Sequence, residues 1–181
     1  MKLSFYTRNP RKVELLRGLL AERGVTAEVV QAEPPPEIQA DTCEQVVVHT
    51  LKGVQNGVAE DSGLFIPALG GFPGVITAYV QERLRPEHLL RLMRGRRREA
   101  VFRSAAGVAL SGEVRVFTGE MHGVIAPRPL GKSEHWLDTL FIPRGESRSL
   151  AEMSEAERFE VSDWKRSFTA LAEYIAQTLS P

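Results

Sequence analysis

Residues 57–74 read Gly-Val-Ala-Glu-Asp-Ser-Gly-Leu-Phe-Ile-Pro-Ala-Leu-Gly-Gly-Phe-Pro-Gly. The short apolar approach at Val58 and Ala59 is typical of a buried strand, and we expect it to end at two adjacent carboxylates, Glu60 and Asp61. A second apolar run then ends in a Gly-Gly-x-Pro-Gly loop. Carboxylates are costly to bury unless a cation or hydrogen bonds compensate them, so this segment favours a hard-metal site. The alternative is an exposed turn at the end of a strand.

The composition of the chain narrows the classes of protein to which it can belong. Its 181 residues show no break in composition, so we predict a single domain over residues 1–181. Lys plus Arg (23) equals Asp plus Glu (23), which argues against a general nucleic-acid binder. The longest uncharged stretch, residues 62–81, is interrupted by Gly and Pro and does not predict a membrane span. The single cysteine, Cys43, fits a reduced, cytoplasmic setting.

Predicted strands and helices alternate early in the chain, and a hairpin follows in the middle. The sequence predicts strands at residues 2–6, 25–32, from 58, 100–110 and 113–125. It predicts helices from Asn9-Pro10, over 42–55, 86–94, from Ser154, and over 162–179. Residues 131–143 are expected to form a loop or a broken strand. This order indicates an α/β fold with a mixed central sheet.

The segment Thr7-Arg8-Asn9-Pro10-Arg11-Lys12 lies between a predicted strand and the start of a predicted helix. Backbone N–H groups at a helix N-terminus, together with the helix dipole, favour bound anions. The Thr7 hydroxyl can donate a hydrogen bond, and Arg8, Arg11 and Lys12 supply positive charge. A structural N-cap beside solvated cations is the alternative. A triphosphate needs cations on one side and oxygen-bound Mg²⁺ on the other.

The candidate metal ligands of such a site are Glu37, Glu60 and Asp61. Glu37 follows Pro34-Pro35-Pro36, a rigid connector that restricts where this carboxylate points. For Glu37 alone, a solvated loop acid is the alternative.

Taken together, these segments resemble the inosine triphosphate pyrophosphatase family, whose members remove non-canonical purine nucleoside triphosphates. The family pattern Thr-Gly-Asn-x-x-Lys is matched by residues 7–12, with Arg8 in place of glycine. The segments that match further family motifs are Pro35-Pro36-Glu37-Ile38-Gln39-Ala40, Asp61 to Leu64, Ala68 to Gly74, and Arg98-x-Ala100-x-Phe102-x-Ser104. The resemblance runs in order through essentially the whole chain.

The resemblance implies an elongated α/β fold with a central mixed sheet, flanking helices and two lobes around a nucleotide-binding cleft, as a homodimer. It implies hydrolysis of a nucleoside triphosphate to the monophosphate and pyrophosphate, with Mg²⁺ or Mn²⁺. By position, Glu37 and Asp61 would bind the metal with support from Glu60, and Asp61 would be the base. The residues implied to contact substrate are Thr7, Arg8, Asn9, Lys12, His49, Ser62, His135, Asp138, Arg158, Ser162 and Asp163.

The expected base-binding segments depart from the family pattern. Where the family has Phe-Gly-Trp/Tyr-Asp-Pro-x-Phe, this chain has His135-Trp-Leu-Asp-Thr-Leu-Phe141. His49 and Arg158 stand where the family has lysines. Ser-His-Arg at the start of the last helix becomes Ser162-Asp163-Trp164. An ionised Asp163 can only accept hydrogen bonds, so we hypothesise a base that carries an exocyclic amine. A structural role of Asp163 at the helix start is the alternative.

Two other functions compete with that of a pyrophosphatase. One is a regulatory protein of the same fold that binds nucleotides with little or no turnover, motivated by the lost lysines and the lost Ser-His-Arg. The other is a nucleic-acid-binding module that uses the arginine cluster at residues 94–98, which the zero net charge disfavours.

Overall fold

The computed structural model describes residues 1–36 and 38–179, so Glu37 lies outside the described residues. The strands are β1 (Lys2–Tyr6), β2 (Glu28–Ala32), β3 (Asn56–Phe65), β4 (Pro73–Gly74), β5 (Glu99–Leu110), β6 (Glu113–Ile125) and β7 (Phe141–Pro143). The α-helices are α1 (Pro10–Glu22), α2 (Cys43–Thr50), α3 (Thr77–Arg83), α4 (Pro86–Leu92), α5 (Glu155–Val161) and α6 (Asp163–Leu179). Short 3₁₀ helices are η1 (Pro67–Leu69), η2 (Trp136–Thr139) and η3 (Leu150–Glu152). No helix in the described ranges is long and apolar enough to cross a membrane.

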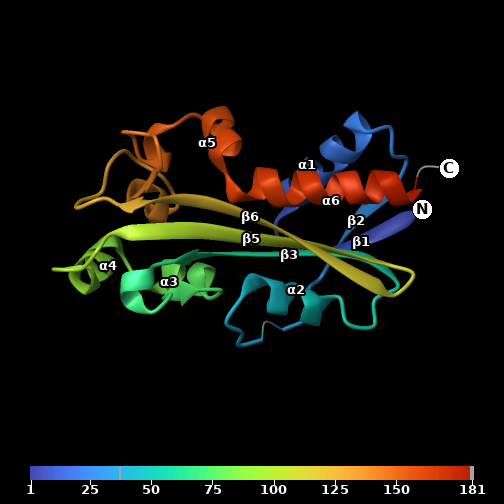
Figure 1. Cartoon of the computed structure of the whole chain (residues 1–181), viewed down its shortest axis with the longest axis horizontal. Helices are drawn as coiled ribbons and strands as arrows, with labels where there is room; N and C mark the ends of the chain where they lie inside the picture. Colours follow the sequence, from blue (N-terminus) through green and yellow to red (C-terminus); the bar gives the residue numbers. More distant parts are fainter. Residues whose placement is uncertain (37, 180–181) are drawn as a thin grey trace. The chain divides into compact units, whose positions relative to one another are not determined.

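In the described part of the chain, seven strands form one mixed sheet (Figure 1). The strand order is β2-β1-β3-β5-β6-β7, and β4 pairs with β3. β1 runs parallel to β2 and to β3, with Ser4 opposite Gly57, whereas β4 and β7 pair antiparallel with β3 and β6. The predicted α/β fold with a mixed sheet is therefore confirmed.

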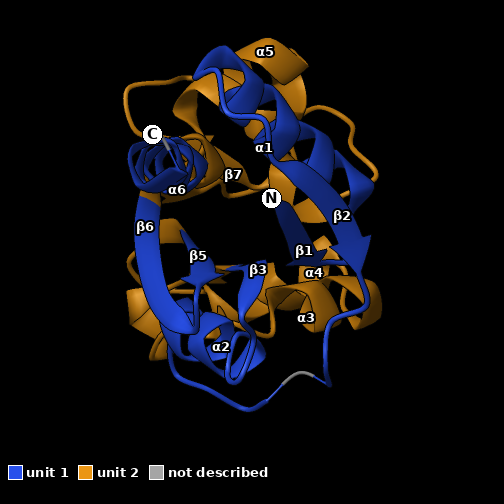
Figure 2. Cartoon of the chain, turned by 90° about the vertical axis from the view of Figure 1, so that its right-hand side faces the viewer, with its two compact units in different colours: residues 1–61, 104–119, 166–181 blue, residues 62–103, 120–165 orange. Residues whose placement is uncertain are grey.

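The chain forms two compact units (Figure 2). Unit 1 contains residues 1–61, 104–119 and 166–181, and unit 2 contains residues 62–103 and 120–165. Strands β3, β5 and β6 and helix α6 contribute residues to both. The expectations of a single domain and of a cleft between lobes stay predictions.

Within unit 1, α1 and α6 lie on one face of the sheet and α2 on the other (Figure 1). Small residues on strand β5 allow both α6 and α2 to pack closely against it. The hydroxyl of Ser104 bonds that of Ser167 on α6, whereas a Cβ at Gly107 would lie 2.4 Å from Val47 Cγ1 on α2. Residues three apart on a strand face opposite sides, so β5 is covered on both faces and carries small residues there.

The predicted first helix is confirmed, but the second strand begins three residues later than expected. Asn9 caps α1 by accepting from the Arg11 N–H at 3.0 Å. At the other end, Gly24 has a φ of +69° and donates to Ala21 O, while Val25 donates to Leu20 O. These two bonds form a Schellman motif. Val25 therefore belongs to the helix end, and β2 starts at Glu28.

Strand β3 is longer than predicted, and α2 is shorter. Gly53, with a φ of +77°, follows the end of α2, so the chain enters β3 at Asn56 instead of remaining helical to residue 55. The expectation that the strand ends at Glu60 and Asp61 is wrong, because β3 continues to Phe65. Both carboxylates therefore lie inside a strand, where neighbouring side chains point to opposite faces.

In unit 2, Gly63 and Leu64 pack against the Pro-Gly segment at Pro73 and Gly74 through their backbone. A Cβ at Gly63 would lie 2.1 Å from the Gly74 carbonyl oxygen, so only glycine fits. The Thr77 hydroxyl donates to Gly74 O at 2.6 Å and accepts from the Leu64 N–H at 2.7 Å. Strands β3 and β4 can therefore lie this close together only because position 63 is a glycine.

The other predicted elements agree with the structure to within about two residues, but α3, the short strand β4 and the 3₁₀ helices η1 and η3 were not predicted. Ser111 and Gly112 both have positive φ, as a tight hairpin between β5 and β6 requires. Ser154 caps α5 in a reciprocal pair with Glu157, as predicted. Residues 131–143 form only η2 and the short β7.

The packing of α2 on β5 yields a stability prediction. We expect Gly107→Ala to lower the free energy of unfolding by about 1–3 kcal/mol, because its methyl group has no room against Val47. The control is Gly18→Ala in the middle of α1, where a Cβ meets nothing within 4 Å. This change should stabilise by about 0.5–1 kcal/mol. Urea denaturation of both variants measures the difference, and equal stabilities would contradict the tight packing.

Candidate functional site

The turn between β1 and α1 has the predicted form of a helix N-terminus. Thr7 is 8% exposed, and its Oγ1 accepts from the Asn9 N–H at 3.1 Å. Asn9 is then the N-cap of α1. The Thr7 bond uses a lone pair of the oxygen, so it does not consume the hydroxyl hydrogen. The N–H groups of Asn9, Arg11 and Lys12 already donate within this turn, so it offers an anion the positive end of the helix dipole and nearby side chains.

Lys12, in the first turn of α1, forms an ion pair with Glu60 on β3. The Glu60 side chain is 0% exposed and that of Lys12 is 14% exposed. Ser104 Oγ on β5 donates to the other Glu60 oxygen at 3.3 Å and lies 2.7 Å from Ser167 Oγ on α6. Two residues from distant parts of the sequence, Ser104 and Ser167, thus complete a polar cluster inside unit 1.

Asp61 contacts a different part of unit 1 from its neighbour Glu60. It lies beside Cys43, the first residue of α2, which is 2% exposed. Burial raises the pKa of the Cys43 thiol well above its usual value, and the Asp61 charge and a hydrogen bond to Asp61 raise it further. Cys43 therefore stays a neutral thiol that donates to Asp61. A carboxylate is a suitable oxygen ligand for Mg²⁺.

The expected metal-binding triad is only partly described by the structure. Glu37 lies outside the described residues. Within residues 1–36 and 38–179, no group of three His, Cys, Asp or Glu side chains could hold a metal ion. Both described members, Glu60 and Asp61, are carboxylates, the donor type that Mg²⁺ prefers, and Glu60 is paired with Lys12. Ser62, expected to contact phosphate, is partly buried on β3 in unit 2.

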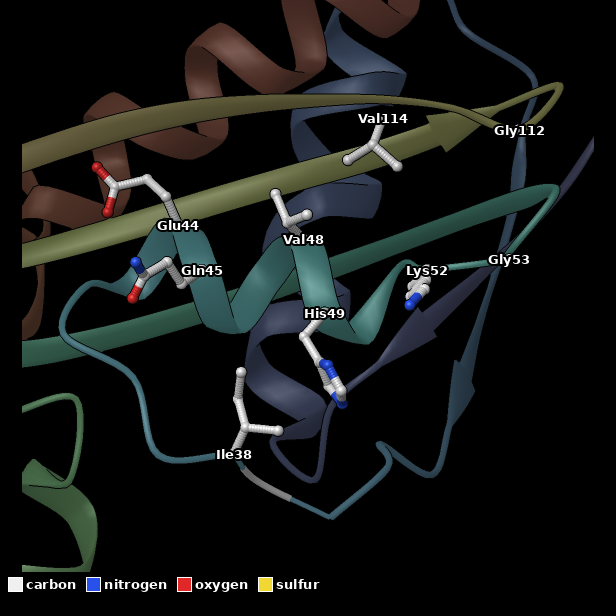
Figure 3. A pocket seen from close by; sticks show the side chains of 9 residues that line it. All are labelled: Ile38, Glu44, Gln45, Val48, His49, Lys52, Gly53, Gly112 and Val114. Carbon is white, nitrogen blue, oxygen red and sulfur yellow. The ribbon is translucent and has the colours of Figure 1, made fainter.

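Two further expected substrate contacts in unit 1 lie at the surface. Arg8 forms an exposed ion pair with Glu33 at 2.8 Å. His49 lies near the end of α2 and lines a pocket of about 660 Å³ (Figure 3). The other residues that line this pocket are Ile38, Glu44, Gln45, Val48, Lys52, Gly53, Gly112 and Val114.

In unit 2, the expected base-binding residue His135 is held by α3. The Gln81 side-chain amide is 2.7 Å from His135 Nδ1, and the Trp136 indole N–H donates to Gln81 O at 2.8 Å. Trp136 also packs against the hydrophobic core of unit 2. These contacts favour a packing role for Trp136 over contact with a base.

Asp138 and Arg158 are brought together as an ion pair of 3.4 Å in unit 2. The same Asp138 oxygen accepts from Ser133 Oγ at 2.9 Å, and Ser133 Oγ accepts from the His135 N–H at 3.2 Å. These bonds order the loop that carries His135. Neither Ser133 nor Gln81 was a predicted site residue, and no sequence signal pointed to them.

The start of α6 is capped by Ser162, because Ser162 Oγ accepts from the Lys165 N–H at 3.1 Å. The same hydroxyl donates to Phe159 O at 2.9 Å. Asp163 is the first helical residue and is 5% exposed. An acid is favoured there by the helix dipole, which supports a structural contribution of Asp163.

Comparisons with known proteins agree with the resemblance found in the sequence. The family model described as the Ham1 family matches residues 3–174. The dITP/XTP pyrophosphatase of Thermococcus kodakarensis is 39% identical over 186 residues, which cover 99% of this chain and 100% of that protein. The dITP/XTP pyrophosphatase of Methanopyrus kandleri is 36% identical, with 96% of each chain covered.

Solved structures share the fold. The nucleoside-triphosphatase / dITP/XTP pyrophosphatase from Mycobacterium abscessus superposes with a TM-score of 0.79 at 32% identity, covering 94% of this chain and 97% of that one. The HAM1 protein from Coxiella burnetii gives a TM-score of 0.82 at 20% identity, covering 98% and 99%, and supports the fold alone. The family match over nearly the whole sequence shows that this chain is a member of the Ham1 family.

Proposed function

We propose that this protein hydrolyses a non-canonical purine nucleoside triphosphate to the monophosphate and pyrophosphate. The observation that carries the proposal is the full-length match to relatives named dITP/XTP pyrophosphatases. The arrangement in unit 1 supports it. Lys12 stands in the first turn of α1, beside the Thr7–Asn9 turn, and Asp61 supplies a carboxylate on β3.

Asp61 and Glu37 are the proposed ligands of Mg²⁺, with Mn²⁺ as the substitute. The metal, when bound, would neutralise phosphate charge and make a coordinated water more acidic. Asp61 would accept the proton of the water that attacks the α-phosphate. The Cys43 thiol, which donates to Asp61, would orient that carboxylate. The expected third acid, Glu60, is engaged by Lys12 and Ser104.

The proposed phosphate contacts are the side chains of the turn before α1, because the N–H groups of Asn9, Arg11 and Lys12 are bonded within the turn. The residues that we propose to contact the nucleotide are Thr7, Arg8, Asn9, Lys12, His49, Ser62, His135, Asp138, Arg158, Ser162 and Asp163. Arg8 would have to exchange its exposed pair with Glu33 for phosphate, which costs little because surface ion pairs are weak. A homodimer and a cytoplasmic location are also proposed on the resemblance.

The first prediction concerns turnover and its dependence on Asp61. Pyrophosphate release with Mg²⁺ should be seen for at least one member of a panel of ribo- and deoxynucleoside triphosphates that includes ITP, dITP and XTP. Asp61→Asn should lower kcat by about 10²–10⁴-fold, because the amide is neither a base nor a good metal ligand. Thermal unfolding of the variant controls for folding. Nucleotide binding without pyrophosphate release from any member would instead favour a binding protein.

The second prediction concerns the base. An ionised Asp163 accepts hydrogen bonds only, whereas an amide can also donate to a 6-oxo group. We expect Asp163→Asn to raise the kcat/KM ratio of ITP over dATP by about tenfold.

The control for this prediction is Glu160→Gln, which removes a nearby acid whose side chain is 66% exposed. It should leave the ITP-to-dATP ratio unchanged. The same ratio in Asp163→Asn as in the wild type would assign Asp163 a purely structural role at the start of α6.

A further inference from the structure

We propose that Glu60 is a positioning residue that holds the Lys12 ammonium at the phosphate end of the site, and that it is not a metal ligand. This inference rests on the proposed function, in which Lys12 contacts phosphate. It replaces the sequence-based expectation that Glu60 and Asp61 share one metal ion.

The burial of Glu60 shows where its charge is compensated. A carboxylate whose side chain is 0% exposed needs partners for both oxygens. Lys12 Nζ contacts Oε2, and Ser104 Oγ donates to Oε1 at 3.3 Å. Both partners belong to the protein and lie in unit 1. The charge of Glu60 is therefore compensated without any metal ion.

The hydrogen bonds of the two serines have a defined direction. An ionised carboxylate only accepts, so the single hydroxyl hydrogen of Ser104 goes to Glu60. In the 2.7 Å bond between the hydroxyls of Ser104 and Ser167, Ser167 must then be the donor. Ser104 is 1% exposed and Ser167 is 0% exposed, so the network is fixed by packing. The Ser104 hydroxyl, which accepts from Ser167, thus directs its hydrogen to the carboxylate that pairs with the Lys12 ammonium.

The position of Glu60 on β3 separates it from Asp61. Neighbouring strand residues point to opposite faces of a sheet. Glu60 meets Ser104, whose partner Ser167 is on α6, whereas Asp61 meets Cys43 on α2. Helices α6 and α2 cover opposite faces of the sheet (Figure 1). The partners of the two carboxylates therefore place them toward opposite faces, which disfavours their ligating one ion.

Holding Lys12 in advance has a consequence for phosphate binding. A lysine side chain loses much conformational freedom when it is ordered, and ordering it before the ligand arrives lowers the cost of binding. The bond to Glu60 uses one of the three ammonium hydrogens. Pairing with Glu60 does not by itself prevent an ammonium group from donating to a phosphate oxygen.

The first test compares metal binding to the full chain by titration with Mn²⁺ alone, followed by electron paramagnetic resonance. Glu60→Gln keeps the size of the side chain and removes its charge. We expect its Mn²⁺ Kd to stay within about threefold of wild type, whereas Asp61→Asn should weaken binding about 10–100-fold. A loss in Glu60→Gln as large as that in Asp61→Asn would overturn the proposal, since it would make Glu60 a ligand.

The second test measures binding of inorganic tripolyphosphate in EDTA, by calorimetry. Glu60→Asp retains the negative charge but shortens the side chain. A change in tripolyphosphate affinity would therefore report a change in the position of Lys12 and not a change in the local electrostatic field. We expect its Kd to rise about tenfold. In a Lys12→Met background the same change should have no further effect, because the ammonium is already gone. An unchanged Kd in Glu60→Asp, or additive effects in the double variant, would overturn the proposal.

Ser104→Ala keeps the proposal testable if Glu60→Asp does not fold. It removes one hydrogen bond to Glu60 and leaves both charges in place, so tripolyphosphate should bind about threefold more weakly with the Mn²⁺ Kd unchanged. No effect on tripolyphosphate would again count against positioning. These readouts do not require turnover. A wild type that hydrolyses no nucleotide but shows the expected coupling would refute the proposed function alone.

Discussion

The alternation of side chains along β3 governs how this chain uses its acidic residues. Glu60 and Asp61 are adjacent in sequence and lie within a ten-residue strand, so they face opposite sides of the sheet. One carboxylate meets Lys12 on α1, and the other meets Cys43 on α2. A pair that resembles a shared metal site in the sequence is thus divided between two tasks. Asp61 remains suited to metal binding and proton transfer, while Glu60 stabilises a cation.

This division depends on the close covering of β5. Ser104 can bond Glu60 only because β5 lies next to β3, and Ser167 reaches Ser104 because α6 packs directly on that face. On the opposite face, the absence of a side chain at Gly107 leaves room for Val47 of α2 to pack against the strand. Small residues along β5 let both helices approach, which excludes water from the Glu60 carboxylate. In a dry environment, electrostatic attraction to Lys12 is stronger than it would be at the surface.

In unit 2, residues expected to meet the base are already bonded to the protein. His135 is joined to Gln81, Asp138 accepts from Ser133 and Arg158, and Ser162 caps α6. Such bonds reduce the conformational freedom of this end before any ligand binds. The orientation of His135 thus depends on Gln81, a residue that no motif of the sequence pointed to. Asp163 is buried at the start of α6, and its carboxylate accepts hydrogen bonds only when it is ionised.

The sequence by itself determined the fold class, most of the elements, the turn before α1 and the family. These features depend on local signals such as the Asn9 cap, the hairpin at Ser111 and Gly112, and spaced glycines, each of which acts over a few residues. Tertiary structure alone decided the partners of the charged groups. The contacts of Lys12 with Glu60 and of Ser104 with Ser167 join residues 48 and 63 positions apart. No local pattern encodes such pairs, because they follow from which strands become neighbours and from which face of a strand each side chain occupies. The extension of β3 beyond Asp61 was misjudged for the same reason, since pairing with β1 and β4, and not local propensity, sets where that strand begins and ends.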